Sequence, residues 1–365
     1  MNKLLQNKKN MMFFGIAILY CVGIIIYAWI CCETTGKDSM GFQYEKPFLI
    51  GSVFLIIGSM VVVWLVCVKN AELHNIYLAM SFIVLSLLVW TQTPLHHHDN
   101  QFHHDSTYVL SNILLGQDES VGIGGGRVET YYRRECDRFM QYAGFHKFIE
   151  AYADMQKEMF AKPKAENTAL VEASTYQNFV SEPLYFYLPQ AIGFVIARVF
   201  NLNVYWLLYL GRIFIATACS LMTWRAIKNT PVYKEIFLIC GMIPTTLLSY
   251  VTVSRDALIL AFSFYYVSKC FQIAYSETVI KWLDYVLLVL SLILLAPYKF
   301  VYIPFALLLG LIVWKKRTPN KKNQKLWLFT IIVVILVVVF FVAINYEYIK
   351  TYLTGANKGS LGENA

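Results

Sequence analysis

The sequence predicts an all-α fold, a polytopic bundle of about nine transmembrane helices with one large extracytoplasmic loop between spans three and four. Of the 365 residues, 58% are hydrophobic and only 15% are charged, a balance typical of membrane proteins. Apolar runs of roughly 20 residues, the length that crosses about 30 Å of hydrocarbon, recur along the chain. Connections between spans that are rich in lysine and arginine also alternate with connections that are poor in them, which favours one orientation in the membrane.

The apolar runs give the spans in chain order. The first run follows a basic start (Lys3, Lys8 and Lys9) but lacks a small-residue cleavage pattern, so we interpret it as a retained span rather than a signal peptide. The predicted spans are 11–30, 48–68, 76–91, 204–224, 235–253, 257–273, 282–296, 300–314 and 326–345.

Charge decides the orientation. With the N-terminus inside, the densest basic connection, 315–325, is cytoplasmic as well. Segment 183–200 is apolar enough to be a tenth span, but counting it would invert every later connection. We therefore expect 183–200 to form a juxtamembrane or re-entrant helix at the outer surface, where it could form the wall of a pocket.

This topology predicts four segments of the chain. Within the extracytoplasmic loop between spans three and four, residues 131–152 and 152–162 are expected to be charged helical stretches. The segments are a three-span part at 1–91, the extracytoplasmic loop with its juxtamembrane helix at 92–203, a six-span bundle at 204–345 and an outer tail at 346–365.

Several kinds of chemistry are disfavoured by the sequence. The eight cysteines show no metal-binding or disulfide spacing. The glycine-rich run 122–127 has no Lys-Ser/Thr after it and no strand–turn–helix pattern, so we interpret it as a turn rather than a phosphate loop. The net charge of +8 does not indicate a nucleic-acid partner, because the basic residues are segregated by membrane side.

The end of span three carries the most unusual polar cluster. Asp99 and Asp105 stand among five of the seven histidines, and partial desolvation there should raise the pKa of Asp99 toward that of a general base. Three interpretations compete: a catalytic carboxylate with helper histidines, a divalent-metal site (although the spacing matches no standard ligand pattern), and a polar cap on a helix end. The histidines are His96, His97, His98, His103 and His104.

Cations on the same predicted side could complete a site. Arg212 lies inside span four, where a buried guanidinium by default faces a cavity or an anion, or else snorkels to the headgroups. Arg255 and Asp256 lie in the turn between spans five and six, and Lys299 in the turn between spans seven and eight. An ordinary solvated turn is the alternative for these three. Asp284, near the inner interface, is expected to be structural.

A series of short segments resembles DUF2142, a family of bacterial polytopic membrane proteins grouped with the GT-C type glycosyltransferases. Asp99-Asn-Gln-Phe-His103 is similar to the family's Asp-Glu-x-x-His signature. The resemblance covers roughly 94–310 in order. Its further segments are Tyr108–Ser111, Tyr187–Gly193, Tyr209–Arg212, Ile243-Pro244, Ser254–Leu258 and Lys299-x-x-Tyr302-x-Pro304.

The resemblance implies an outer-surface active site in a bacterial plasma membrane, fed by a polyprenyl-phosphate-linked sugar. Asp99 would be the base, with His103 positioning it. Substrate contacts are expected from Arg212, Arg255, Asp256, Lys299 and Asp105, and the acceptor would be a cell-envelope glycan or glycolipid.

Two departures from the family pattern stand out. Asn100 replaces the signature's Glu, which weakens a second-carboxylate or metal role, and the chain ends soon after span nine, which predicts a shortened or divergent member. The alternatives to an enzyme are a flippase-type transporter and a non-catalytic component of envelope polysaccharide assembly. A transporter is disfavoured because few ionisable residues, essentially Arg212 and Asp284, lie within the spans.

Overall fold

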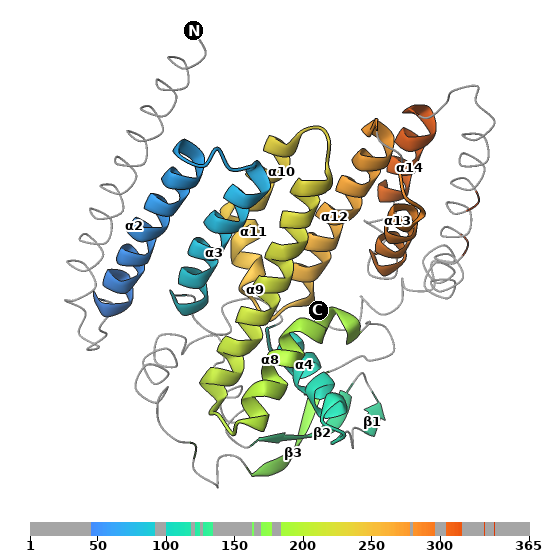
Figure 1. Cartoon of the computed structure of the whole chain (residues 1–365). Coiled ribbons are helices and arrows are strands. Elements are labelled where there is room, and N and C mark those ends of the chain that lie inside the picture. Colours follow the sequence, from blue (N-terminus) through green and yellow to red (C-terminus); the bar gives the residue numbers. More distant parts are fainter. Residues whose placement is uncertain are drawn as a thin grey trace, which may run out of the picture. The chain divides into compact units, whose positions relative to one another are not determined.

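Figure 1 shows the computed structural model of the chain. Contacts divide the chain into two compact units, 1–225 with 235–261 and 226–234 with 262–365, which are described separately. The described residues are 45–91, 100–117, 121–124, 127–133, 163, 169–176, 184–277, 280–295, 304–315 and the single positions 332 and 339. Span 11–30 and nearly all of span 326–345 therefore lie outside the described residues, and the division at 91, 203 and 345 stays a prediction.

Apolar helices form most of the first unit. They are α2 (Glu45–Cys67), α3 (Leu73–Thr91), α9 (Val204–Asn229, in this unit to Arg225), α10 (Lys234–Met242, from Glu235) and α11 (Pro244–Tyr250). Predicted spans 48–68, 76–91 and 204–224 coincide with α2, α3 and α9. Span 235–253 is instead divided into α10 and α11, because Pro244 occupies the first turn of α11 and cannot continue a preceding helix.

Two of the described helices are long and apolar enough to cross a bilayer by themselves. They are α9 and α12 (Arg255–Tyr275), of which α12 belongs to the first unit as far as Ala261. The chain is thus mostly helical where it is described, with helices of membrane-spanning character, as the sequence predicted.

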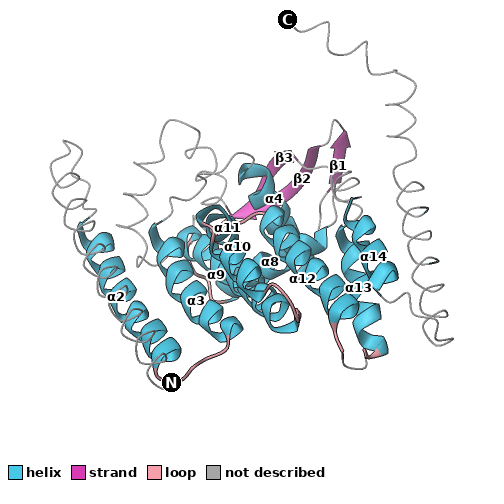
Figure 2. Cartoon of the chain, turned by 90° about the horizontal axis from the view of Figure 1, so that it is seen from above, coloured by secondary structure: helices cyan, strands magenta, loops and turns pink. Residues whose placement is uncertain are grey.

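The connection between α3 and α9 contains a small sheet, so the all-α expectation is incomplete. Its strands β1 (Val121–Gly124), β2 (Arg127–Arg133) and β3 (Leu170–Tyr176) lie side by side in that order (Figure 2) and pair antiparallel. Arg127 lies opposite Tyr176, and Arg133 lies opposite Leu170. The helix predicted from 131 is wrong at its start, which is strand, and the rest of 134–162 lies outside the described residues. Of the glycine-rich run 122–127, residues 122–124 belong to β1 and Arg127 begins β2, so this described part is strand rather than turn, and 125–126 lie outside the described residues.

Segment 183–200 forms a short 3-10 turn η1 (Leu184–Tyr187) followed by helix α8 (Leu188–Val199). Twelve residues extend about 18 Å, too short for a complete span. Gly193 allows α8 to cross α9 closely, because a Cβ there would lie 2.5 Å from the backbone of Leu210. The helix predicted for this segment is confirmed, whereas its depth in the membrane stays a prediction.

Helix α4 (Asn100–Leu114) is polar yet buried, and the sequence did not predict it. Every residue from His103 to Asn112 is buried, and α4 packs on α8, η1 and β3. A helix buried on all faces is normally apolar. Here the buried faces carry hydroxyls, imidazoles, an amide and a carboxylate, so α4 depends on a connected polar network.

The second unit contains the rest of α12 with α13 (Trp282–Leu295) and α14 (Pro304–Lys315), near predicted spans 257–273, 282–296 and 300–314. Lys269 in α12 is 1% exposed, and its Nζ donates to Asp284 Oδ1 at 2.6 Å and to Gln272 Oε1 at 2.9 Å. Asp284, which was expected to be structural, thus pairs with Lys269. Lys269 is an ionisable residue of a predicted span that sequence reasoning missed.

Candidate functional site

The N-terminal end of α4 places His103 inside the protein. His103 is 4% exposed, and its Nδ1 lies 2.8 Å from the hydroxyl oxygen of Tyr187, with which it shares a hydrogen bond. Which atom donates depends on the imidazole tautomer. Because Tyr187 is itself fully buried, this bond fixes the orientation of the His103 ring.

The turn before α12 brings a cation to the same end of α4. The hydroxyl of Ser254 accepts a hydrogen bond from the backbone N–H of Asp256 at 3.1 Å, as an N-cap does. This geometry starts α12 at Arg255, whose guanidinium lies over the ring of Phe102, 5.5 Å from its centroid. Asp256 is exposed on the first turn.

Gln190 connects α8 to this turn. The side chain is fully buried, and its Nε2 lies 3.3 Å from the carbonyl oxygen of Phe186 and 3.5 Å from that of Ser254. Two carbonyl neighbours favour the amide nitrogen on this side, which leaves Oε1 as the acceptor facing away. Oε1 has no hydrogen-bond partner in the structure, so Gln190 offers a buried acceptor for a donor.

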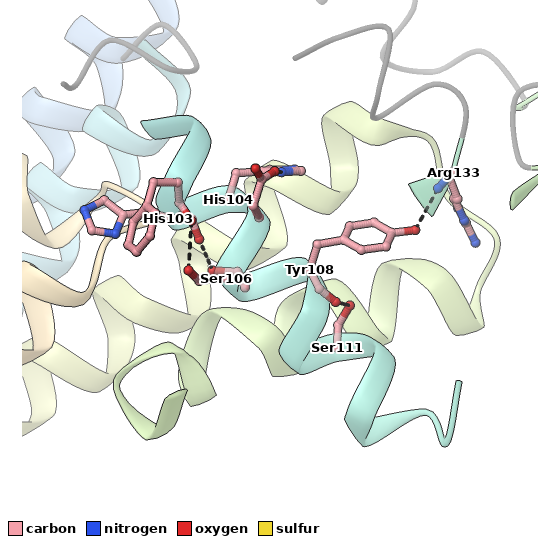
Figure 3. A network of polar contacts seen from close by, with 9 residues as sticks. His103, His104, Ser106, Tyr108, Ser111 and Arg133 are labelled. Atoms are coloured by element: carbon pink, nitrogen blue, oxygen red, sulfur yellow. Dashed lines mark hydrogen bonds and ion pairs between the residues drawn. The ribbon is translucent and has the colours of Figure 1, made fainter. Parts of the chain in front are cut away.

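His104 and Asp105 follow His103 along α4. Successive residues of a helix point about 100° apart, so His104 projects in a different direction from His103 (Figure 3). It packs against Phe194 of α8, with ring centroids 5.3 Å apart. Asp105 is 3% exposed, and its Oδ1 lies 3.7 Å from His104 Nδ1. The described residues contain no group of three or more side chains arranged to hold a metal ion, whereas His96, His97 and His98 lie outside them.

The second half of α4 attaches the sheet to the helices. The hydroxyl of Tyr108 accepts from the backbone N–H of Arg133 at 3.0 Å (Figure 3), and the Arg133 side chain donates to the carbonyl oxygens of Leu202 and Arg198 at 2.8 and 3.0 Å. Arg198 donates to Ser111 Oγ at 2.6 Å and lies 4.6 Å from the centroid of the Tyr108 ring. Both arginines therefore have a structural role.

Arg212 of α9 lies beside the C-terminal end of α3. It is 5% exposed, and its Nη1 lies 3.3 Å from the carbonyl oxygen of Val89. The last turn of a helix has carbonyls without intrahelical donors, so Arg212 caps α3. The neighbouring Gly211 faces Phe194 and Val253, which puts Arg212 at the level of the turn before α12.

Of the predicted site residues, the structure brings His103 and Arg255 to one end of α4. Asp105 lies further along α4, Asp256 on the surface beside Arg255, and Arg212 at the α3 terminus. Asp99 and Lys299 lie outside the described residues.

Comparison with known proteins identifies the chain. The model of a family of predicted membrane proteins, DUF2142, matches residues 82–360. The chain belongs to the DUF2142 family. No curated protein and no solved structure matches it. The resemblance drawn from the sequence motifs is confirmed, and with it a membrane protein, whereas the match assigns no activity.

In this DUF2142 protein, motif segments far apart in sequence meet around α4. His103 of the signature segment contacts Tyr187 of the Tyr187–Gly193 segment, and Gln190 of that same segment reaches the Ser254–Leu258 segment. Gly193 packs on the Tyr209–Arg212 segment. The family resemblance included these segments but assigned no role to Tyr187 or Gln190.

Arg198 and Arg133 were missed by sequence reasoning. An arginine inside the apolar stretch 183–200 was a visible signal for Arg198, since such a residue requires partners. Arg133 gave no such signal, because its partners lie 65 residues or more further along the chain.

Proposed function

We propose that this protein is a GT-C-like membrane glycosyltransferase. It transfers a sugar from a polyprenyl-phosphate donor to a cell-envelope glycan or glycolipid on the outer face of a bacterial plasma membrane. The observation that carries the proposal is the buried polar site at the start of α4. His103, Tyr187, Gln190 and Arg255 come together there from three separate motif segments.

Asp99 is the proposed general base. It immediately precedes Asn100, the first residue of α4, in the sequence. Asp99 takes the proton of the acceptor hydroxyl, and the oxygen attacks the anomeric carbon in line. The carbon–oxygen bond to phosphate breaks, the phosphate leaves with the electron pair, and the anomeric configuration inverts.

His103 is the proposed positioning residue. Its bond to Tyr187 holds the imidazole so that it can orient Asp99 or the acceptor hydroxyl.

Arg255 lies over the Phe102 ring at this end of α4, and it is the proposed clamp for the phosphate of the leaving group together with Arg212 and Lys299. A guanidinium binds phosphate oxygens in a bidentate manner and stabilises the charge that develops in the transition state.

A flippase would need ionisable groups forming a pathway through the spans. Lys269 adds one such group, but its ion pair with Asp284 neutralises it within the second unit. This pair supports helix packing, so transfer is the favoured activity.

Replacing Asp99 in cells that depend on the protein tests the proposal. Asp99→Asn should reduce transfer by about 10²–10⁴-fold, the usual contribution of a general base, and deplete the glycan. The matched control is Glu235→Gln, which changes an exposed acid on α10 and should leave the glycan unchanged. Normal envelope glycan with Asp99→Asn at wild-type expression would refute the catalytic assignment.

A further inference from the structure

A groove runs along the interface of α3 and α9 in the first unit and is named here the α3–α9 groove. Its volume is about 690 Å³, within the range of small-molecule sites. It is lined by Leu65, Asn75, Leu78, Ala79, Ser81, Phe82, Leu85, Ser86, Val89, Ile213, Ala216, Thr217, Ser220 and Leu221.

The lining of the α3–α9 groove is mostly apolar, and none of these residues carries a charge. Its edges are open to the outside of the helices, since Phe82 is 73% and Leu221 48% exposed. α9 is long and apolar enough to cross a bilayer and α3 is a shorter apolar helix, so in a membrane this opening would face hydrocarbon and a lipid chain could enter sideways without crossing water.

An arginine lies at one end of the groove. α3 and α9 run antiparallel, because Arg212 lies 3.3 Å from the Val89 carbonyl at one end and Trp224 Nε1 lies 3.4 Å from Asn75 Oδ1 at the other. Val89 and Ile213 both line the groove, so the Arg212 guanidinium lies at its Val89 end. From Asn75 to Val89 the groove extends about 21 Å, most of one bilayer core.

We propose that the α3–α9 groove binds the hydrocarbon tail of the polyprenyl-phosphate donor, with Arg212 contacting its phosphate. This inference rests on the proposed function and states where the polyprenyl-phosphate donor binds. A guanidinium has five N–H donors, so Arg212 can cap α3 and bind a phosphate oxygen together.

The position of the charged end supports the polyprenyl donor as the occupant. Gly211, next to Arg212, faces Phe194 and Val253, and Val253 adjoins the Ser254-Arg255 turn at the start of α4. A phosphate held by Arg212 would therefore lie at the level of the proposed site. A groove between one pair of helices also suits a single chain better than the two chains of a phospholipid.

Photolabelling tests this assignment independently of turnover. Purified full-length protein in phosphatidylethanolamine–phosphatidylglycerol vesicles is labelled with a polyprenyl phosphate that carries a photoreactive group in its tail, and the labelled peptides are mapped. Thr217→Trp fills the groove from an exposed position, and Ile239→Trp on α10 is the matched control, because Ile239 is 62% exposed and does not line the groove. Thermal melting checks that each variant is folded.

The expected result is labelling of α3 and α9 peptides that falls about tenfold in Thr217→Trp and stays unchanged in Ile239→Trp, a loss of about 1.4 kcal/mol of binding. Arg212→Gln should abolish the preference for polyprenyl phosphate over polyprenol, and Arg212→Lys should retain part of it. Labelling elsewhere, or equal displacement by polyprenol or excess phosphatidylglycerol, would overturn the inference.

The same samples separate this inference from the proposed function. Sugar transfer with labelling outside the groove refutes the groove and leaves the function standing. Groove labelling that shows the phosphate preference, without turnover of any polyprenyl-phosphate sugar, supports the groove and refutes the function.

Discussion

The bond between His103 and Tyr187 is the contact on which the proposed site most depends. Both side chains are buried, and each comes from a different motif segment of the family resemblance. The sequence identified His103 as a site residue because it lies in a signature with Asp99. It could not identify its partner, because Tyr187 is 84 residues away and one of 25 tyrosines.

Tyr187→Phe should keep the fold and impair transfer. The change removes one buried hydrogen bond, worth about 0.5–1.5 kcal/mol of unfolding free energy, and releases the His103 ring. The matched control is Tyr185→Phe, which alters a more exposed hydroxyl in the same turn and should change neither property. Melting and turnover of the purified variants measure both, and equal turnover in the two variants would deny Tyr187 a positioning role.

At the scale of elements, the crossing of α8 and α9 sets the position of Gln190 and of the proposed site. Glycine permits this crossing because Cβ atoms on α8 would otherwise separate the two backbones. The sequence predicted a helix at 183–200 and excluded it as a span from charge, but the partner helix of Gly193 could not be predicted from local pattern.

Gly193→Ala should destabilise the protein by about 1–3 kcal/mol, since its Cβ would overlap the backbone of Leu210. Gly310→Ala in α14 is the control. A Cβ there meets no atom within 4 Å, so the change should be neutral or stabilise by about 0.5–1 kcal/mol. Melting temperatures in detergent distinguish the two, and identical shifts would mean that α8 and α9 do not cross at Gly193.

The Lys269–Asp284 pair joins α12 to α13 in the second unit. Asp284→Asn should destabilise by about 3 kcal/mol, because it leaves a buried ammonium without its counter-charge. The double variant Lys269→Met with Asp284→Asn should recover much of that loss. A double variant as unstable as the single one, by chemical denaturation, would show that the two side chains are not coupled.

At the scale of the whole molecule, the length of apolar runs predicted most described helices to within a few residues. The break at Pro244 was readable from proline but was not used. The sheet was missed because β2 and β3 are separated by residues 134–169, and strand pairing over such a distance leaves little local signal. The site was located in part, since histidines and a carboxylate beside a span are conspicuous, whereas buried neutral partners such as Gln190 are not.

The predicted orientation has its own test. In a background without the native cysteines, Gln117→Cys after α4 should react with a membrane-impermeant thiol reagent applied to intact cells, because the loop is expected outside. Pro231→Cys, in the exposed connection from α9 to α10, should react only after permeabilisation. The reverse pattern would invert the topology and place the proposed site on the cytoplasmic face.

The most direct measurement is the release of polyprenyl phosphate from a polyprenyl-phosphate sugar by the purified protein with an envelope glycan acceptor. The account predicts turnover by the wild-type protein and by Glu235→Gln, and a loss of about 10²–10⁴-fold in Asp99→Asn. Undiminished turnover by Asp99→Asn, or none by the wild-type protein with any donor of this class, would contradict it.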